Sequence, residues 1–445
     1  MIRNIFDAQQ ATEWKAAIGR YIDDNDNYRK ARDKVGLDQY FSALQSGRPR
    51  WINNKWACGR GEFARANLKL IKQHQSLGSQ SLGRRYGMPL HNCGNQCVEG
   101  KHVQTMRAHK HFTVDLHAHL LTPAVEPLVA ECPQKKGEPE MMLRMQGAAS
   151  VAHNVQKMLP QAFRKMTSLD ERLRDMDAMG VDVQVLSPSP NQYYYWADID
   201  LAKEIVRVQN EHVAATCATN AERFAGLGTV ALQHAELSVE QLTHAVKTLG
   251  LKGVEISTAV NGLDLADAKF EKFWAKADEL GCVVFIHPLG TSLGERVNQF
   301  YLTNMIGQPL ETTIALSNLI FGGVLDRNPD VKIVAAHGGG YLPAYIGRSD
   351  HGYQVRPEAS AIQKKPSEYL KQIYFDSLVY SPEQLQNLIA QVGASQIVVG
   401  TDYAFDMGDY DPHELIESLN ALSEEERAMI SGGNAKRILG MELNQ

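Results

Sequence analysis

The sequence predicts an α/β fold, a (β/α)8 TIM barrel preceded by an N-terminal, mostly helical extension. From about residue 112, buried strand-like runs alternate with amphipathic helical segments, a pattern that favours a parallel sheet covered by helices. Eight such runs are present, which is the number that closes a parallel sheet into a barrel. Several runs also end in histidine or aspartate, and barrels carry their functional side chains at the carboxyl ends of their strands.

The expected strands are short runs of β-branched and aliphatic residues bounded by polar or turn-forming residues. In chain order they cover residues 112–120, 181–187, 224–230, 252–257, 282–287, 332–337, 372–376 and 396–401. Because parallel strands must be joined by crossover connections, a helix is expected between each strand and the next.

Helices are expected where apolar residues recur at helical spacing between the strands. The clearest segments are 168–179, 201–217, 266–280 and 382–392. After the last strand, Ser423 and Glu426 form a Ser-x-x-Glu capping box, which predicts a helix over 423–430. Gly432 and Gly433 are expected to break that helix before a short final turn over 434–439.

The segment that follows the first strand departs from this alternation. Residues 120–165 contain Pro123, Pro127, Pro133 and Pro139, and they are expected to form a long loop. A loop in this place lies on the active-site face of a barrel, so it should shape or cover the pocket.

Residues 1–110 also lack the alternation and are assigned to a separate extension, whereas residues 111–445 form the barrel. The extension has helix-like stretches at 11–35 and 61–75 and holds 19 Lys and Arg against 9 Asp and Glu, a formal charge of +10. The rest of the chain carries −15. Since no nucleic-acid motif is present, the basic extension is expected to pack on its own acidic barrel or on a neighbouring subunit.

A set of cysteines and histidines in the extension could be interpreted as a structural zinc site. Its members are Cys58, His91, Cys93, Cys97 and His102. Their spacing is looser than that of paired CxxC knuckles, so a role in capping the barrel or extending a dimer interface is preferred.

Composition limits the class of protein. The chain has 445 residues, with 44% hydrophobic and 22% charged residues, and no apolar run approaches the length of a membrane span. A soluble globular protein without membrane contact is therefore expected. The first residues lack the apolar segment of a secretory signal, and the six cysteines show no disulfide pattern, so a reduced, cytoplasmic location is expected.

Four candidate metal ligands stand at three of the predicted strand ends. They are His117, His119, His287 and Asp402. Residues two apart on a strand face the same side, so both imidazoles of His117-x-His119 can reach one cation. Imidazole with carboxylate suits zinc, with manganese, iron or cobalt as alternatives, and four ligands leave room for water.

An ordered set of motifs carries a family resemblance across residues 112–441. The matching elements are Asp115-Leu116-His117-Ala118-His119, Arg172–Asp177 with the following 183–196, His287-Pro288, Pro309–Thr313, Ala336-His337-Gly338-Gly339-Gly340, Gly347-Arg348 and Gly400-Thr401-Asp402-Tyr403. The chain thereby resembles the amidohydrolase superfamily, and within it the 2-amino-3-carboxymuconate-6-semialdehyde decarboxylase group. Leu289 and Ala404 depart from the residues usual there, which weakens the case for that exact substrate.

The resemblance implies roles for three site residues. His337 would take a proton from metal-bound water or give one to the substrate, with a structural or ligand role as the alternative. Asp402 would relay protons as well as bind metal. Arg348 would reach across a dimer interface to bind a substrate carboxylate in the neighbouring subunit, unless it forms a surface ion pair.

Other substrate contacts are less firmly indicated. Arg164 is a candidate for a second carboxylate clamp, in competition with Arg144. Tyr195 and Trp196 belong to an aromatic segment that could line the pocket or simply pack. Glu255 could bridge a second metal, but a single-metal site is preferred, in which Glu255 is a supporting carboxylate.

The resemblance implies a metal-dependent, non-oxidative decarboxylase of an unsaturated or aromatic carboxylic acid in aromatic-compound degradation, with zinc and a homodimer or multiple of dimers. The alternative is a hydrolase or hydratase that uses the same metal to cleave a C–C or C–N bond or to add water to a muconate-type acid. A catalytically silent binding protein is a third possibility, against which the full ligand set argues.

Overall fold

The structure is a computed structural model that describes residues 107–441 of the 445-residue chain. The predictions made for residues 1–106, including the helix-like stretches and the Cys and His set, lie outside the described residues.

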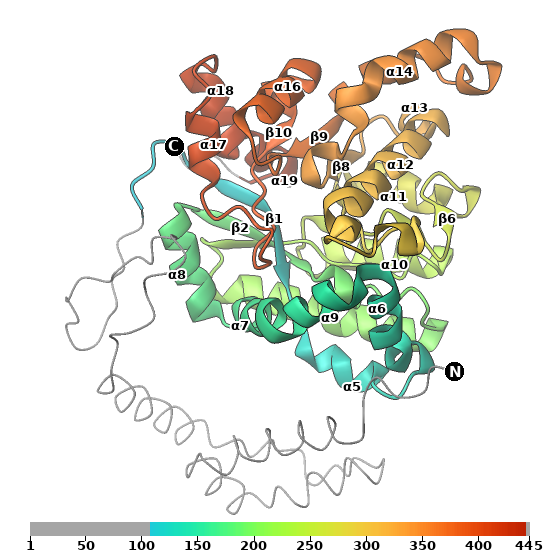
Figure 1. Ribbon diagram of the computed structural model, residues 1–445, viewed down its shortest axis with the longest axis vertical. Coiled ribbons are helices and arrows are strands. Elements are labelled where there is room, and N and C mark those ends of the chain that lie inside the picture. The colour runs from blue at the N-terminus through green and yellow to red at the C-terminus, as the bar shows by residue number, and fades with distance from the viewer. Residues whose placement is uncertain (1–106, 442–445) are drawn as a thin grey trace, which may run out of the picture. The chain divides into compact units, whose positions relative to one another are not determined.

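The described part of the chain is built around eight parallel strands, each of which overlaps one of the eight predicted runs (Figure 1). The strands are β1 (Val114–Leu120), β2 (Val183–Pro188), β3 (Phe224–Gly226), β4 (Gly253–Ile256), β7 (Val283–Ile286), β8 (Lys332–Ala335), β9 (Ile373–Asp376) and β10 (Ile397–Val398). A small antiparallel hairpin, β5 (Ala259–Val260) with β6 (Leu263–Asp264), is added after β4.

The strands close into a barrel in chain order. Strands β1 to β3 form one run and β4 with β7 to β10 another, and short bridges join the two runs at both ends. One junction pairs Asp115 with Val399, where the Leu116 N–H donates to the Val399 carbonyl at 2.9 Å. The other joins Gly228 to β4, where the Gly228 N–H donates to the Gly253 carbonyl at 2.9 Å. The predicted (β/α)8 barrel is therefore confirmed.

Aliphatic side chains fill the barrel interior, and the last helix closes one end of it. Buried residues from β1, β2, β7, β8 and β10 form one cluster together with Ala435, Ile438 and Leu439 of α19 (Asn434–Leu439). A Cβ on Gly432 would lie 2.3 Å from the Phe112 carbonyl oxygen, so the chain passes directly beneath the start of β1. The helix α19 therefore plugs the amino-terminal end of the barrel.

The predicted helix break before α19 is wrong. Helix α18 (Glu424–Ala428) starts at the predicted capping box, and the chain then continues through a π-helical turn, Met429–Gly433, directly into α19. The Asn434 N–H donates to the Met429 carbonyl, so the backbone stays hydrogen-bonded through the glycines. Gly432 serves the close approach to β1, and neither glycine marks a helix end.

Helices surround the sheet, and all four predicted interstrand helices are confirmed (Figure 1). Side-chain caps start three of them: Ser168, Asp198 and Ser381 each accept a backbone N–H from the first turn. No helix within residues 107–441 is long and apolar enough to cross a membrane. The outer helices are α8 (Leu169–Met179), α9 (Ile199–Thr219), α10 (Ala235–Lys247), α11 (Glu271–Leu280), α12 (Gln308–Phe321), α13 (Val324–Arg327), α14 (Leu342–Val355), α15 (Pro366–Tyr369), α16 (Pro382–Val392) and α17 (Pro412–Glu417).

The long loop predicted after β1 is mostly helical instead. It contains α5 (Glu126–Val129), α6 (Pro133–His153), a π-helical turn and α7 (Leu159–Thr167). Pro123, Pro127 and Pro133 occupy first-turn positions, where the missing N–H would have had no helical partner. These prolines mark helix starts, and the prediction wrongly took them as marks of an irregular loop.

This helical segment joins two other loops on the carboxyl side of the strands. In α6, the Arg144 carbonyl accepts the Asn298 side-chain amide at 3.3 Å, which ties the helix to the loop after β7. Gly147 has a left-handed φ of 75°, and a Cβ there would lie 2.0 Å from the Asn298 carbonyl oxygen. At the end of α6, His153 lies 3.1 Å from Asp406 in the loop after β10. The segment thus spans the face predicted to carry the site.

Candidate metal centre

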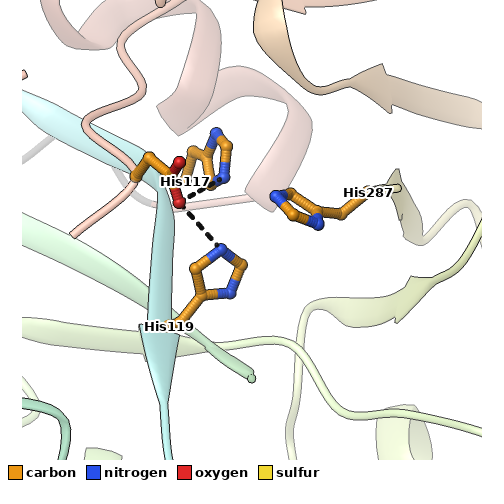
Figure 2. A group of neighbouring side chains, drawn as sticks. His117, His119 and His287 are labelled. Atoms are coloured by element: carbon orange, nitrogen blue, oxygen red, sulfur yellow. Dashed lines mark ion pairs between the residues drawn. The ribbon is translucent and has the colours of Figure 1, made fainter. Parts of the chain in front are cut away.

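Four side chains from three strand ends meet at the carboxyl side of the barrel (Figure 2). His117 and His119 project from β1, His287 follows β7, and Asp402 follows β10. One nitrogen or oxygen atom from each lies within 4.8 Å of the others, and all four residues are buried. The structure therefore brings together the four candidate ligands identified from the sequence.

The nitrogen and oxygen atoms that these four side chains offer to a metal ion have no hydrogen-bond partner among the described residues. They are His117 Nε2, His119 Nε2, both ring nitrogens of His287 and Asp402 Oδ1. Asp402 Oδ1 lies 3.4 Å from His117 Nε2 and 3.3 Å from His119 Nε2. Buried polar atoms are rarely left without partners, and three imidazoles with one carboxylate match the donor set of zinc and related divalent cations. The residues therefore fit a metal ion.

Each β1 histidine has a carboxylate behind it, on the side away from the shared centre. His117 Nδ1 lies 2.7 Å from Asp376 Oδ2 at the end of β9. His119 Nδ1 lies 3.5 Å from Glu255 Oε2 in β4, and the other oxygen of Glu255 accepts the Tyr193 hydroxyl at 2.5 Å. Such partners orient metal-binding imidazoles. Glu255 lies in the position of a supporting carboxylate, the role expected for it in a single-metal site.

His337 lies beside the four ligands but outside their group. It occupies the turn after β8, its Nε2 is 3.8 Å from Asp402 Oδ2, and its side chain is 11% exposed. Its backbone is left-handed, with φ of 54°, which is uncommon for a residue other than glycine. This position is suited to proton transfer at the edge of the ligand group.

A buried polar network lies under the ligand-bearing backbone, and it was not predicted from the sequence. Asp115 accepts the Thr401 hydroxyl at 2.6 Å and the Gln184 amide at 2.8 Å. The fully buried Arg172 donates to the Gln184 side-chain oxygen and to the His119 carbonyl, each at 2.6 Å. The network therefore holds β1, β2 and the loop that leads to Asp402 in a fixed relation.

Charge within the site follows from burial and the close carboxylates. Burial lowers the pKa of His117, but Asp402 and Asp376 outweigh it and raise that pKa to about 10. Burial works against ionised Asp402, yet His117 and His119 hold its pKa well below the usual range. His287 has a pKa well below its usual value because of burial and the neighbouring histidines. His287 is therefore neutral, the form of imidazole that binds metal.

The predicted substrate contacts do not all gather at the ligands. Arg348 lies exposed on α14 and makes no ion pair or side-chain hydrogen bond within the described range 107–441. Arg164, on α7, is 63% exposed and its Nε lies 2.9 Å from Glu171, so a clamp would have to give up this pair. Arg144 is also exposed, on α6.

The aromatic segment after β2 packs into the barrel wall. Tyr195 is buried, stacks on Tyr193 with ring centroids 5.5 Å apart, and accepts the Ser257 backbone N–H at 3.2 Å. Trp196 lies against Tyr194, with ring centroids 5.5 Å apart. These contacts favour the packing interpretation that the sequence left open for this segment.

Other aromatic side chains that sequence reasoning missed stand near the ligands. The Phe405 ring centroid is 5.6 Å from that of His119. Tyr301, after β7, and Tyr380, after β9, both have left-handed backbones, with φ of 60° and 62°. Burial together with Asp406 and Asp402 raises the pKa of Tyr301 to about 12, which keeps its phenol protonated. The signal available in the sequence was their position in loops that follow strand ends.

The chain is similar in sequence to two proteins that carry the same enzyme name. The chain is 37% identical over 278 residues to 2-amino-3-carboxymuconate-6-semialdehyde decarboxylase of Dictyostelium discoideum, covering 62% of this chain and 77% of the relative. It is 27% identical over 384 residues to the enzyme of the same name from Caenorhabditis elegans, covering 74% of this chain and 95% of the relative.

Solved structures share the fold. The crystal structure of 5-carboxyvanillate decarboxylase from Sphingomonas paucimobilis superposes with a TM-score of 0.64 at 24% identity, covering 75% of this chain and all of the other. The enzyme from Novosphingobium aromaticivorans, complexed with manganese and 4-hydroxy-3-methoxy-5-nitrobenzoic acid, has a TM-score of 0.65 at 20% identity, covering 74% and 96% of the two chains. The amidohydrolase family model matches residues 114–441, which include every strand of the barrel and all four converging ligands. The chain therefore belongs to the amidohydrolase family.

Proposed function

We propose that this protein is a metal-dependent, non-oxidative decarboxylase of an unsaturated or aromatic carboxylic acid. The observation that carries the proposal is the convergence of His117, His119, His287 and Asp402, with His337 beside Asp402. The similar proteins support the reaction class, because they are named as decarboxylases of carboxymuconate semialdehyde, γ-resorcylate and carboxyvanillate.

One divalent cation per chain would be held by the three imidazoles and the carboxylate. Zinc is the ion that this donor set favours, and manganese, present in a solved relative, is the alternative. A bound cation would supply positive charge that polarises a substrate oxygen and offsets the charge that develops during the reaction.

The chain's own residues would manage the proton. When a carboxylate leaves as carbon dioxide, the electron pair of the broken C–C bond remains on the substrate carbon, and one proton must take its place. His337, at the edge of the ligand group, would deliver that proton from Nε2. Asp402 Oδ2 lies 3.8 Å from this nitrogen, on the side of the ligand group.

Substrate binding would draw on residues outside the ligand group. Arg348 would bind a substrate carboxylate in the neighbouring subunit of a homodimer, because a guanidinium group suits two-point binding of a carboxylate. Its exposure on α14 leaves it available for such a contact. Arg164 would be a second clamp only if it exchanged its pairing with Glu171 for the substrate.

The test is carbon dioxide release from a panel of candidate acids, including carboxymuconate semialdehyde, 2,6-dihydroxybenzoate and 5-carboxyvanillate. Purified protein would be stripped with a chelator and restored with zinc or with manganese. We expect carbon dioxide and a product one carboxyl group smaller, with activity only after a metal is returned. Turnover of an acid without carbon dioxide would replace the proposal with a hydrolase or hydratase.

A further inference from the structure

We infer that Asp376 is a positioning residue that holds the ligand His117 and the acid–base residue His337 in one arrangement. The inference concerns a side chain that the sequence did not single out, and it rests on the proposed function for the roles of those two histidines. It is carried by the hydrogen bonds of a single, completely buried carboxylate.

One oxygen of Asp376 serves both histidines. Oδ2 lies 2.7 Å from His117 Nδ1 and accepts the backbone N–H of His337 at 2.9 Å. His117 must be neutral to bind a metal ion, and a neutral imidazole has one N–H, so donation to Asp376 then puts that proton on Nδ1. The lone pair of Nε2 is then left facing Asp402 and the shared centre. Asp376 thus selects the form of His117 that can bind a metal ion.

The other oxygen stabilises the turn that carries His337. Oδ1 accepts the Gly338 N–H at 2.7 Å and the Leu378 N–H at 3.2 Å. His337 and Gly338 have successive left-handed φ values of 54° and 60°. That backbone is unfavourable for histidine, and successive N–H groups in such turns form a concave site for an anion. The carboxylate of Asp376 fills this site and holds the turn.

Packing around Asp376 leaves the carboxylate little freedom. Strand β9 lies between β8, which leads to His337, and β10, which leads to Asp402. A Cβ added at Gly400 would lie 2.7 Å from Asp376 Cβ and 2.9 Å from His117 Cβ. The close approach of β1, β9 and the start of the Asp402 loop therefore requires glycine at that position. A displacement of Asp376 would be transmitted to both histidines at once.

The substitution Asp376→Asn conserves shape but cannot conserve these bonds. The amide has one oxygen acceptor and one NH2 donor in place of two acceptors. If the NH2 faced His117, the imidazole would have to move its proton to Nε2, the atom directed at the metal centre. If the NH2 faced Gly338 and Leu378, it would oppose two N–H donors and release the turn under His337. Either orientation damages one of the two functions.

A matched control exists at the opposite end of the barrel. Asp182, just before β2, accepts the Thr113 N–H at 2.7 Å, and its Oδ2 also lies 2.7 Å from His109 Nε2. It therefore makes the same kinds of contact as Asp376, to one backbone N–H and one imidazole, away from the proposed metal site. The substitution Asp182→Asn therefore measures what the loss of a carboxylate–imidazole contact does to the protein when that contact lies away from the proposed metal site.

The experiment compares Asp376→Asn and Asp182→Asn with the wild-type protein. Zinc affinity is measured by chelator competition without substrate, and kcat and KM are measured at saturating zinc. We expect Asp376→Asn to lower zinc affinity by about 10- to 100-fold, the usual effect of removing the partner of a metal-bound histidine. At saturating zinc, kcat should fall while KM is unchanged, because the displaced His337 acts on the chemical step. Asp182→Asn should leave all three quantities unchanged.

Wild-type zinc affinity and kcat in folded Asp376→Asn would overturn the inference, as would equal losses in Asp182→Asn. If Asp376→Asn fails to fold, the zinc-loaded wild-type protein decides through NMR of ¹⁵N-labelled histidine rings. A slowly exchanging proton on His117 Nδ1, assigned with His117→Gln, supports the inference, and its absence overturns it. Zinc affinity and the NMR signal need no substrate, so they separate a failure of this inference from a failure of the proposed reaction.

Discussion

Two regions of the site, called the floor and the mouth, differ in how firmly their side chains are held. The floor comprises buried polar residues of the barrel strands: His117, His119, Asp115, Glu255 and Asp376. Each floor residue comes from a strand of the barrel, and most of its polar atoms make hydrogen bonds, face a charged partner or face the shared centre. The floor therefore has one arrangement, set by the closure of the sheet.

The second region, the mouth, comprises α6 and the loops after β7 and β9, which include Phe300, Tyr301 and Tyr380. Phe300 is 80% exposed and Tyr380 56% exposed, and all three residues have left-handed backbones. Exposed aromatic side chains on irregular loops can change their contacts at a small cost in the free energy of unfolding. We expect the floor to determine the chemistry and the mouth the choice of acid, as when different reactions share a scaffold.

Removal of a ligand at the centre should have the largest effect. Asp402→Ala deletes the one carboxylate within residues 107–441 that faces His117, His119 and His337 together. We expect turnover to be abolished and metal content to fall, while circular dichroism and cooperative unfolding show an intact barrel. A near-native rate in this variant would exclude Asp402 from the ligand set.

The second prediction tests whether His337 transfers protons without binding the metal. His337→Ala should keep the metal, because His337 lies outside the converging group. Turnover should fall by about 10²- to 10⁴-fold, the usual contribution of a positioned acid or base. Elemental analysis and steady-state rates on one preparation give the answer. Loss of metal in this variant would make His337 a ligand.

The third prediction asks whether a neighbouring subunit completes the mouth. Arg348→Ala should reduce kcat/KM by about 10- to 100-fold, which corresponds to the loss of a charge-assisted hydrogen bond of about 1.5–3 kcal/mol. Mixing Arg348→Ala chains with His337→Ala chains should restore activity, since a mixed dimer holds one complete site. If mixed dimers form and remain inactive, Arg348 does not act across the interface.

The same contrast between floor and mouth explains what could be predicted from the sequence. His117, His119, His287 and Asp402 were identified because a polar residue at the end of a buried run is a local signal. Asp376 also ends a predicted strand, but its partner His117 lies 259 residues earlier, and no local pattern records that contact. The segment after β1 was misassigned because its prolines fit both a loop and the first turn of a helix.

The smallest expected effect comes from the mouth, at the left-handed Gly147 in α6. Gly147→Ala would place a Cβ 2.0 Å from the Asn298 carbonyl oxygen and impose on alanine a φ of 75°, which costs about 1–2 kcal/mol before any steric clash. Helix α6 should shift from the loop after β7, raising KM and lowering Tm. Zinc affinity should be unchanged, because no floor residue contacts Gly147 among its nearest neighbours.

Gly137→Ala is the matched control in the same helix. A Cβ there meets nothing within 4 Å, and alanine favours a helix over glycine by about 0.5–1 kcal/mol. This variant should therefore keep the wild-type KM and be at least as stable. If Gly147→Ala instead lowered zinc affinity as strongly as Asp376→Asn, a disturbance at the mouth would be reaching the ligands. A structural change in the mouth would then always displace the floor as well, and substrate choice could not change without changing the metal centre.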